Sequence, residues 1–110
     1  MTEQVIRDLA AFDAGLARPR VLLFKHSPTC PVSAVARAQY RLWRLDHPDA
    51  PTMFVDVVAS RALARDIAAR CGVEHESPQA VLFEGGEAVW SASHASITLG
   101  ALEAAWAPRC

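Results

Sequence analysis

The pattern of apolar and polar residues predicts that helices and strands alternate along the chain. The first apolar stripe has helical spacing over residues 3–16 and consists of Val5, Leu9, Phe12 and Leu16. The next run, residues 21–25, is almost entirely apolar, which is typical of a short strand that is buried on both faces. The first quarter of the chain therefore predicts a helix followed by a core strand.

The middle of the chain repeats this alternation. A second helix is predicted from Pro31 to about Leu45, and its buried face would consist of Val35, Ala38 and Leu42. Residues 52–58 predict a second strand. Ser60 is then the expected cap of a third helix, which Gly72 ends. The buried stripe of that helix would be Leu63, Ile67 and Cys71.

The last third of the chain has a different pattern. Gly85-Gly86 is a strong two-residue hairpin signal between two short strands, residues 79–84 and 87–91. A final helix is predicted over residues 96–107, with Leu99, Leu102 and Trp106 on one face. In the order α-β-α-β-α-β-β-α, right-handed crossovers would make the first two strands parallel, and the hairpin would add an antiparallel edge. This α/β order resembles the thioredoxin-like arrangement, a central mixed sheet of about four strands with helices on both faces.

Composition and charge limit the classes of function. The 110 residues, 52% of them hydrophobic, suffice for a single domain over residues 1–110, with a core at about 5–106 and a short tail at 107–110. A net charge of −1 does not indicate the basic surface that nucleic-acid binding requires. Neither a signal peptide nor a membrane span is expected. Three cysteines without a disulfide or zinc pattern suit a reducing cytosol. We expect a cytoplasmic protein that is a monomer.

Cys30 is the centre of the most informative stretch, Phe24-Lys25-His26-Ser27-Pro28-Thr29-Cys30-Pro31-Val32-Ser33. It follows a predicted strand and a turn, and it stands at the predicted start of a helix, where Pro31 suits the first helical position. The free N–H groups and the positive dipole end of a helix stabilise a thiolate. Because the fourth position of the motif is Ser33 and not cysteine, the sequence predicts a redox site with one thiol.

Pro78 is the second candidate site residue. A proline donates no hydrogen bond to a strand ladder, so Ser77-Pro78 is expected at the opening of the strand over residues 79–84. Proteins with the thioredoxin-like arrangement carry a cis-proline at this place, facing the thiol. The fold assignment therefore implies that Pro78 is cis. The backbone beside it would then be free to pair with a substrate chain lying across Cys30.

Four segments of the chain together resemble a known family. They are Phe24-Lys25-His26-Ser27, Thr29-Cys30-Pro31-Val32-Ser33, Gly72-Val73-Glu74-His75-Glu76-Ser77-Pro78-Gln79 and Ser93-His94-Ala95-Ser96-Ile97-Thr98. In order and spacing, from about residue 5 to residue 106, the chain resembles the YtxJ-type redox proteins of the bacillithiol system, the monothiol bacilliredoxins. This family is small, cytosolic and thioredoxin-like, and it is implicated in removing bacillithiol from mixed disulfides on proteins. Pro28 and the terminal Cys110 are not features associated with it.

The resemblance implies bacillithiol as a co-substrate, bacillithiolated client proteins as partners, and no tightly bound cofactor. Attack of the Cys30 thiolate on a protein–bacillithiol disulfide would release the client thiol and leave bacillithiol on Cys30. Since the Ser33 hydroxyl cannot resolve that adduct, a second bacillithiol or a separate reductase would have to clear it. Ser33 is instead a candidate hydrogen-bond donor to the thiolate. The other supporting residues are Pro31, Ser77 and Pro78.

Bacillithiol carries a malate group with two carboxylates, so its pocket needs cations or N–H donors. Lys25 and His26 end the first core strand, at the edge where open α/β sheets place ligands. The predicted start of the last helix offers N–H groups to a carboxylate, and the candidates there are Ser93, His94 and Ser96. A structural alternative, in which Ser96 caps the helix and His94 packs on the surface, stays open. Thr29, beside the thiol, and His75, in the loop before the third strand, complete the predicted set.

Other roles and other functions stay open at this point. Cys71 is expected in the core, and Cys110 is expected to be a tail residue, although it could reach Cys30. A one-thiol protein can also share an iron–sulfur cluster between two chains, and a cleft beside Pro78 could bind peptides without redox chemistry. A zinc site is conceivable but lacks the usual ligand pairs; its ligands would be Cys30, His26 and His75.

Overall fold

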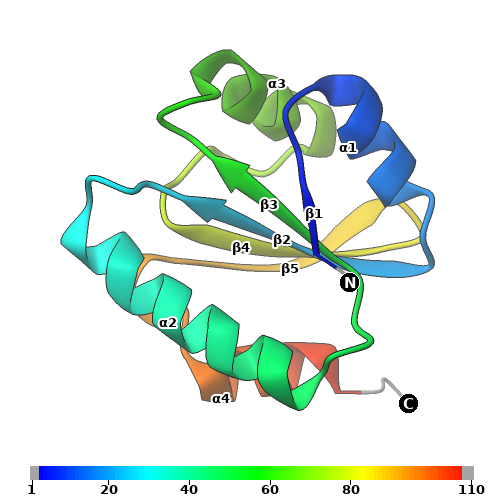
Figure 1. The fold of residues 1–110 in the computed structure, drawn as a ribbon. Coiled ribbons are helices and arrows are strands. Elements are labelled where there is room, and N and C mark those ends of the chain that lie inside the picture. Colours follow the sequence, from blue (N-terminus) through cyan, green and yellow to red (C-terminus); the bar gives the residue numbers. More distant parts are fainter. Residues whose placement is uncertain (1–2, 108–110) are drawn as a thin grey trace.

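The centre of the structure is a five-stranded mixed sheet with two helices on each face (Figure 1). The structure is a computed structural model that describes residues 3–107. Its elements are β1 (Glu3–Val5), α1 (Leu9–Leu16), β2 (Arg20–His26), α2 (Pro31–Asp46), β3 (Thr52–Asp56), α3 (Arg61–Cys71), β4 (Gln79–Glu84), β5 (Glu87–Ser93), the short 3-10 helix η1 (His94–Ser96) and α4 (Leu99–Trp106).

The strands are arranged in the order β1-β3-β2-β4-β5. β3 pairs in parallel with both β1 and β2, whereas β4 is antiparallel to β2 and β5 is antiparallel to β4. The predicted α/β class, a mixed sheet between two layers of helices, is confirmed. The sheet has one strand more than the four expected, because β1 adds to the edge beside β3.

Alternate residues of β2 face two separate cores. Val21 and Leu23 belong to a cluster beneath α1 and α3, whereas Leu22 and Phe24 belong to a cluster beneath α2 and α4. All four side chains are at most 2% exposed, as expected for a strand that is buried on both faces. This double packing fixes the carboxyl end of β2, from which the chain turns towards Cys30.

The start of the chain differs from the predicted helix over residues 3–16. Asp8 has an extended backbone, and its side chain accepts a 2.8 Å hydrogen bond from the Ala11 N–H. Because this capping bond places the first helical residue after Asp8, α1 begins only at Leu9. The residues before it pair with β3 as β1. The helical spacing of Val5 is coincidental, since this side chain is exposed on the edge strand.

α2 buries a different face from the predicted one. Val35 and Leu42 are exposed, and the buried face comprises Ser33, Ala36, Tyr40 and Trp43. The ring of Tyr40 stacks on that of Phe24, with centroids 4.5 Å apart. Burial of two large aromatic rings removes more apolar surface from water than burial of a valine and a leucine, which explains this orientation.

Other predicted boundaries also shift. β5 continues to Ser93, two residues beyond the predicted end. β3 ends at Asp56, two residues earlier than expected. The last helix begins at Leu99 and not at Ser96, because the Thr98 hydroxyl accepts a 3.1 Å hydrogen bond from the Ala101 N–H and caps the helix there. Ser96 therefore belongs to the separate turn η1.

The predicted turns are confirmed. The hairpin between β4 and β5 turns at Gly85 and Gly86, both with positive φ. Gly72 ends α3 in the left-handed conformation, with φ 71°. Within residues 3–107, none of the helices combines the length and the apolar character needed to cross a membrane.

Candidate functional site

Cys30 stands at the N-cap of α2, where the chain passes from β2 into the helix. Its backbone is extended, with φ −107° and ψ 121°, and Pro31 takes the first helical position. The Cys30 carbonyl accepts a 3.2 Å hydrogen bond from the Ala34 N–H, and the Cys30 N–H donates to the Ser27 carbonyl at 3.1 Å. The half-buried thiol is therefore held where the free N–H groups of α2 begin.

Ser33, the fourth residue of the motif, anchors the turn before Cys30. Its Oγ accepts a 2.9 Å hydrogen bond from the Ser27 N–H and lies 2.8 Å from Nδ1 of His26. The side chain is fully buried. Within the described part of the chain, these two partners engage the hydroxyl and no hydrogen bond joins it to Cys30. Donation from Ser33 to the thiolate stays a prediction, whereas its contact with the turn is a feature of the fold.

His26 supports the same turn from the end of β2. Its ring lies 6.2 Å from that of Phe24 and 5.7 Å from that of Phe54, measured between centroids. Burial and the nearby Arg37 lower its pKa, and Asp56 opposes them. The imidazole is therefore neutral at neutral pH. In the structure it packs among aromatic rings and pairs with the Ser33 hydroxyl, while its predicted contact with substrate stays a prediction.

Lys25 points to the opposite face of the sheet and holds the loop before β4. Its Nζ donates a 2.9 Å hydrogen bond to Oε1 of Gln79, whose Nε2 donates to the Glu74 carbonyl at 3.0 Å. Burial lowers the pKa of Lys25 to about 8, although Cys71 and Glu76 act to raise it. Since the side chain is only 1% exposed, the structure places the predicted substrate ligand Lys25 beneath the loop.

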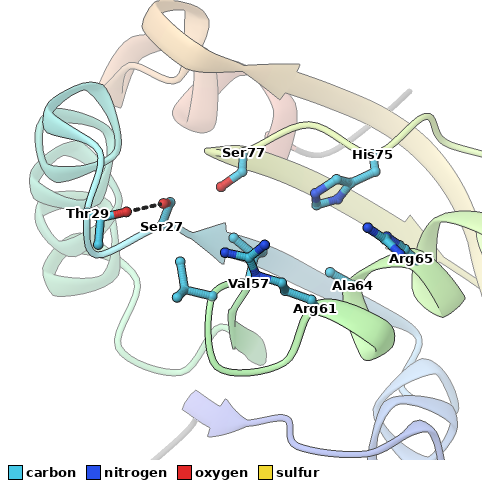
Figure 2. A pocket seen from close by; sticks show the side chains of 9 residues that line it. Ser27, Thr29, Val57, Arg61, Ala64, Arg65, His75 and Ser77 are labelled. Atoms are coloured by element: carbon cyan, nitrogen blue, oxygen red, sulfur yellow. Dashed lines mark hydrogen bonds between the residues drawn. The ribbon is translucent and has the colours of Figure 1, made fainter.

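Pro78 opens β4, and the peptide bond between Ser77 and Pro78 is cis. Antiparallel pairing aligns Lys25 of β2 with Gln79 of β4, so the end of β2 and the start of β4 meet at one edge of the sheet. Figure 2 shows the Ser77 side chain pointing towards the turn that contains Ser27. The loop before Pro78 and the turn before Cys30 thus face each other.

The segment after β5 lies against the loop before Pro78. The His94 N–H donates a 3.0 Å hydrogen bond to the Pro78 carbonyl, and His94 Nε2 lies 2.9 Å from Oε2 of Glu76. His94 itself has a positive φ of 53°. The residues Ser93, His94 and Ser96 are therefore close to the site, but they do not form the start of α4, which Thr98 caps. A carboxylate on N–H groups of α4 would have to bind beyond Ser96.

A pocket of about 310 Å³ opens between these segments and α3 (Figure 2). We call it the α3 pocket. Its polar wall consists of Ser27, Thr29, Arg61, Arg65, His75 and Ser77. His75 has a pKa that is lowered by burial first and then by Lys25 and Arg65, so its ring is neutral at neutral pH. The pocket brings the predicted residues Thr29, His75 and Ser77 together, and Thr29 directly precedes Cys30 in the chain.

Arg61 and Arg65 are not among the site residues predicted from the sequence. They lie one turn apart on α3, and neither forms an ion pair with another residue of the described range 3–107. The sequence does hold a signal for them. Two arginines at spacing i, i+4 open the helix that follows β3, and the carboxyl end of β3 lies at the same sheet edge as that of β2.

A second hollow, of about 350 Å³, lies on the other side of the turn, along α2. It is lined by His26, Pro28, Ala34, Arg37, Ala38 and Arg41. Arg37 and Arg41 are both exposed on α2. Neither Ser77 nor His75 reaches this hollow, so the loop before Pro78 contributes to the α3 pocket and not to the second hollow.

The other cysteines lie apart from this arrangement. Cys71 is half-buried on α3 and packs against the core beneath α1 and α3, as predicted. Cys110 lies outside the described residues. The described residues include no group of three or more His, Cys, Asp or Glu side chains that could hold a metal ion. Cys30, His26 and His75 are therefore not assembled as a zinc site.

Comparisons with known proteins agree with this geometry. A family model described as monothiol bacilliredoxin BrxC matches residues 4–102. A solved structure of a protein with a thioredoxin fold is 32% identical, has a TM-score of 0.88, and the match covers 94% of this chain and 93% of that chain. Mitochondrial thioredoxin 3 from Saccharomyces cerevisiae is 19% identical with a TM-score of 0.73, covering 93% and 91%. A mutant thioredoxin from Halobacterium salinarum is 21% identical with a TM-score of 0.74, covering 94% and 86%. The last two share the fold alone.

Proposed function

Because the chain belongs to the monothiol bacilliredoxin family, we propose that it removes bacillithiol from mixed disulfides on proteins, with Cys30 as the nucleophile. The fold and the family together support a thiol redox function. The observation that carries the proposal is the place of Cys30. It is the N-cap of α2, at the sheet edge where the cis Ser77–Pro78 bond opens β4, and serine occupies the fourth motif position.

The exchange step replaces one disulfide bond by another, so the reacting sulfur atoms undergo no net oxidation or reduction. The Cys30 thiolate attacks the bacillithiol sulfur of the client–bacillithiol disulfide, and a new sulfur–sulfur bond forms as the old one breaks. The client thiolate leaves and takes up a proton from solvent. The client is thereby reduced, and Cys30 carries bacillithiol as a mixed disulfide.

The absence of a thiol at position 33 determines the second step. The Ser33 hydroxyl cannot attack the Cys30–bacillithiol disulfide, so an external thiol has to do so. A second molecule of bacillithiol would attack the adduct, release bacillithiol disulfide and restore the Cys30 thiolate. A separate reductase could supply the same two electrons. Bacillithiol is thus a co-substrate in this scheme, and no tightly bound cofactor is needed.

The partners follow from the same scheme. We propose that bacillithiolated client proteins dock over Cys30 with their backbone beside the cis Ser77–Pro78 bond, where β4 begins. The remaining partner is the thiol or reductase that restores Cys30. We propose that the protein acts as a monomer in the reducing cytoplasm.

Intact mass of the reduced protein after incubation with a bacillithiolated client tests this function. We expect one bacillithiol to transfer to the wild type, with release of one client thiol, and none to transfer to Cys30→Ala. Cys71→Ala is the matched control, since Cys71 lies in the core beside α3, and it should accept bacillithiol as the wild type does. Absence of transfer to a wild type whose Cys30 still reacts with iodoacetamide would overturn the proposal. It would favour a cluster carrier or a peptide-binding module.

A further inference from the structure

The α3 pocket has two cationic groups that form no ion pair within the described residues. Arg61 and Arg65 lie on its wall, and within residues 3–107 neither has an ion-pair partner. Arg20, Arg44 and Arg70 do have acidic partners, which are Glu84, Glu3 and Asp13 respectively. Two neighbouring unpaired guanidinium groups repel each other, so their shared position on one pocket wall favours an anionic ligand.

The remaining polar groups of the pocket are suited to the same ligand. His75 is neutral at neutral pH and offers a ring N–H. The Ser77 hydroxyl is buried, lacks a hydrogen-bond partner among the described residues and points into the opening (Figure 2). A buried hydroxyl without a partner costs free energy that a bound ligand can recover. Two guanidinium groups can each hold a carboxylate in a bidentate pair, so the pocket fits a molecule with two carboxylates.

The size and the position of the α3 pocket also fit a small anionic ligand. The volume of about 310 Å³ lies at the lower end of the range of roughly 300–1,000 Å³ that is typical of small-molecule sites. Ser27 and Thr29 form one side of the pocket, and Cys30 follows directly in the chain. A ligand that is bonded through sulfur to Cys30 can therefore extend into the pocket.

The second hollow is a weaker candidate for that ligand. It has two arginines, Arg37 and Arg41, but it lies on the far side of the turn from the loop before Pro78. Arg37 is already stacked over the ring of Phe54, with its guanidinium carbon 5.3 Å from the ring centroid. A mixed disulfide that lies across Cys30 and Pro78 faces the α3 pocket instead.

We propose that the α3 pocket binds the dicarboxylate end of the low-molecular-weight thiol, the malate group of bacillithiol, and that Arg61 and Arg65 determine this specificity. The inference rests on the proposed function and deepens it, since it assigns the part of the co-substrate that is remote from sulfur. Arg61 and Arg65 act by binding and have no part in the exchange of sulfur–sulfur bonds.

Two disulfides of different charge test the assignment. Reduced protein would react either with bacillithiol disulfide, which carries the carboxylates, or with hydroxyethyl disulfide, which is uncharged. The second-order rate constant of Cys30 modification would be measured for each disulfide by intact mass. For the double variant Arg61→Gln/Arg65→Gln, we expect the rate constant with bacillithiol disulfide to fall about tenfold or more, as for the loss of hydrogen bonds to a charged group. The rate constant with hydroxyethyl disulfide should change less than about threefold, since surface substitutions seldom disturb a fold.

Matched variants separate charge from folding. Arg41→Gln removes an arginine from the second hollow, and it should leave both rate constants near those of the wild type. The double variant Arg61→Lys/Arg65→Lys keeps both charges and should retain most of the preference for bacillithiol disulfide. An unchanged rate constant with bacillithiol disulfide in the glutamine variant, or an equal loss with both disulfides, would overturn the assignment while leaving the proposed function intact. Failure of the wild type to accept bacillithiol from either a client or the disulfide would instead overturn the proposed function.

Discussion

Oγ of Ser33 lies 2.8 Å from Nδ1 of His26, and the same oxygen accepts the Ser27 N–H at 2.9 Å. This contact ties α2 to the end of β2 across the turn that precedes Cys30. Both side chains are buried, with exposures of 0% for Ser33 and 7% for His26. The residue that replaces a resolving cysteine in this motif thus has a structural role of its own, which is to fix the turn on which the reactive thiol stands.

Ser33→Ala tests that structural role. The substitution leaves the Ser27 N–H and His26 Nδ1 without their common partner, and we expect the free energy of unfolding to fall by about 1–3 kcal/mol, the usual cost of an unsatisfied buried polar group. Urea denaturation followed by tryptophan fluorescence would measure it. Ser96→Ala, at an exposed position in η1, is the control and should stay within about 0.5 kcal/mol of the wild type. An equally small effect at Ser33 would show that the hydrogen bonds contribute little.

Ser33→Cys tests the one-thiol chemistry. With bacillithiol bound to Cys30, the introduced thiol can attack the Cys30 sulfur, form an intramolecular disulfide and release bacillithiol. We expect the wild-type adduct to persist when no free thiol is added, whereas the adduct of the variant disappears and leaves a mass two hydrogens below that of the reduced protein. Replacing Cys71 and Cys110 by alanine in both proteins removes the other possible attacking thiols. A persistent adduct on the variant would mean that position 33 cannot reach the Cys30 sulfur.

Much of the fold could be predicted from periodicity and turn chemistry. The apolar run at residues 21–25, the glycine hairpin at Gly85-Gly86 and the end of α3 at Gly72 are local signals, and the structure agrees with each. The three-residue strand β1 could not be predicted in this way. Its pairing with β3 is a tertiary contact, and the helical spacing of its apolar residue with those of α1 concealed it.

The candidate site was also predictable only in part, because some of its residues have local sequence signals and others come together only through tertiary contacts. Cys30 and Pro78 have local signals, a helix start and a strand start, and the pairing of β2 with β4 brings the two segments together. Arg61 and Arg65 differ, because arginines four residues apart are usual on any exposed helix face. Their position after β3 is a weak signal in the sequence, and the structure adds that both line one pocket with Ser27 and Thr29 of the turn before Cys30. Lys25 has a polar side chain in an apolar run, and its burial beneath the loop depends on Gln79, which is distant in sequence.

Replacing each of two helical glycines by alanine should change the stability of the protein in opposite directions. A Cβ at Gly15 in α1 would overlap Sδ of Met53, which is itself buried in β3. We expect Gly15→Ala to destabilise the protein by about 1–3 kcal/mol, because the overlap outweighs the gain in helix propensity. At Gly100 in α4, a Cβ would meet no heavy atom within 4 Å, so Gly100→Ala should stabilise by up to about 1 kcal/mol. Thermal or urea denaturation of the pair would decide, and a stabilised Gly15→Ala would contradict the close packing of α1 on β3.

The pH dependence of stability should report the burial of Lys25. Burial lowers its pKa to about 8 in the folded protein, from the ordinary value of 10.5 that the unfolded chain retains. Between these values the unfolded chain binds more protons than the folded one. The Lys25 contribution to the free energy of unfolding therefore rises with pH across this window, by at most about 1.4 kcal/mol per pH unit.

Lys25→Met isolates this contribution, because Lys25 is the only lysine in the chain. Urea denaturation of both proteins at pH 7, 8, 9 and 10 should show the wild type gaining stability relative to the variant as the pH rises above 8. Burial raises the pKa of Tyr40, which lowers stability at high pH, but both proteins carry Tyr40 and its effect cancels in the difference. The loss of the hydrogen bond to Gln79 adds a difference in the free energy of unfolding that is the same at every pH. Parallel curves for the two proteins from pH 7 to pH 10 would show that Lys25 keeps its ordinary pKa and is accessible to water in the folded protein.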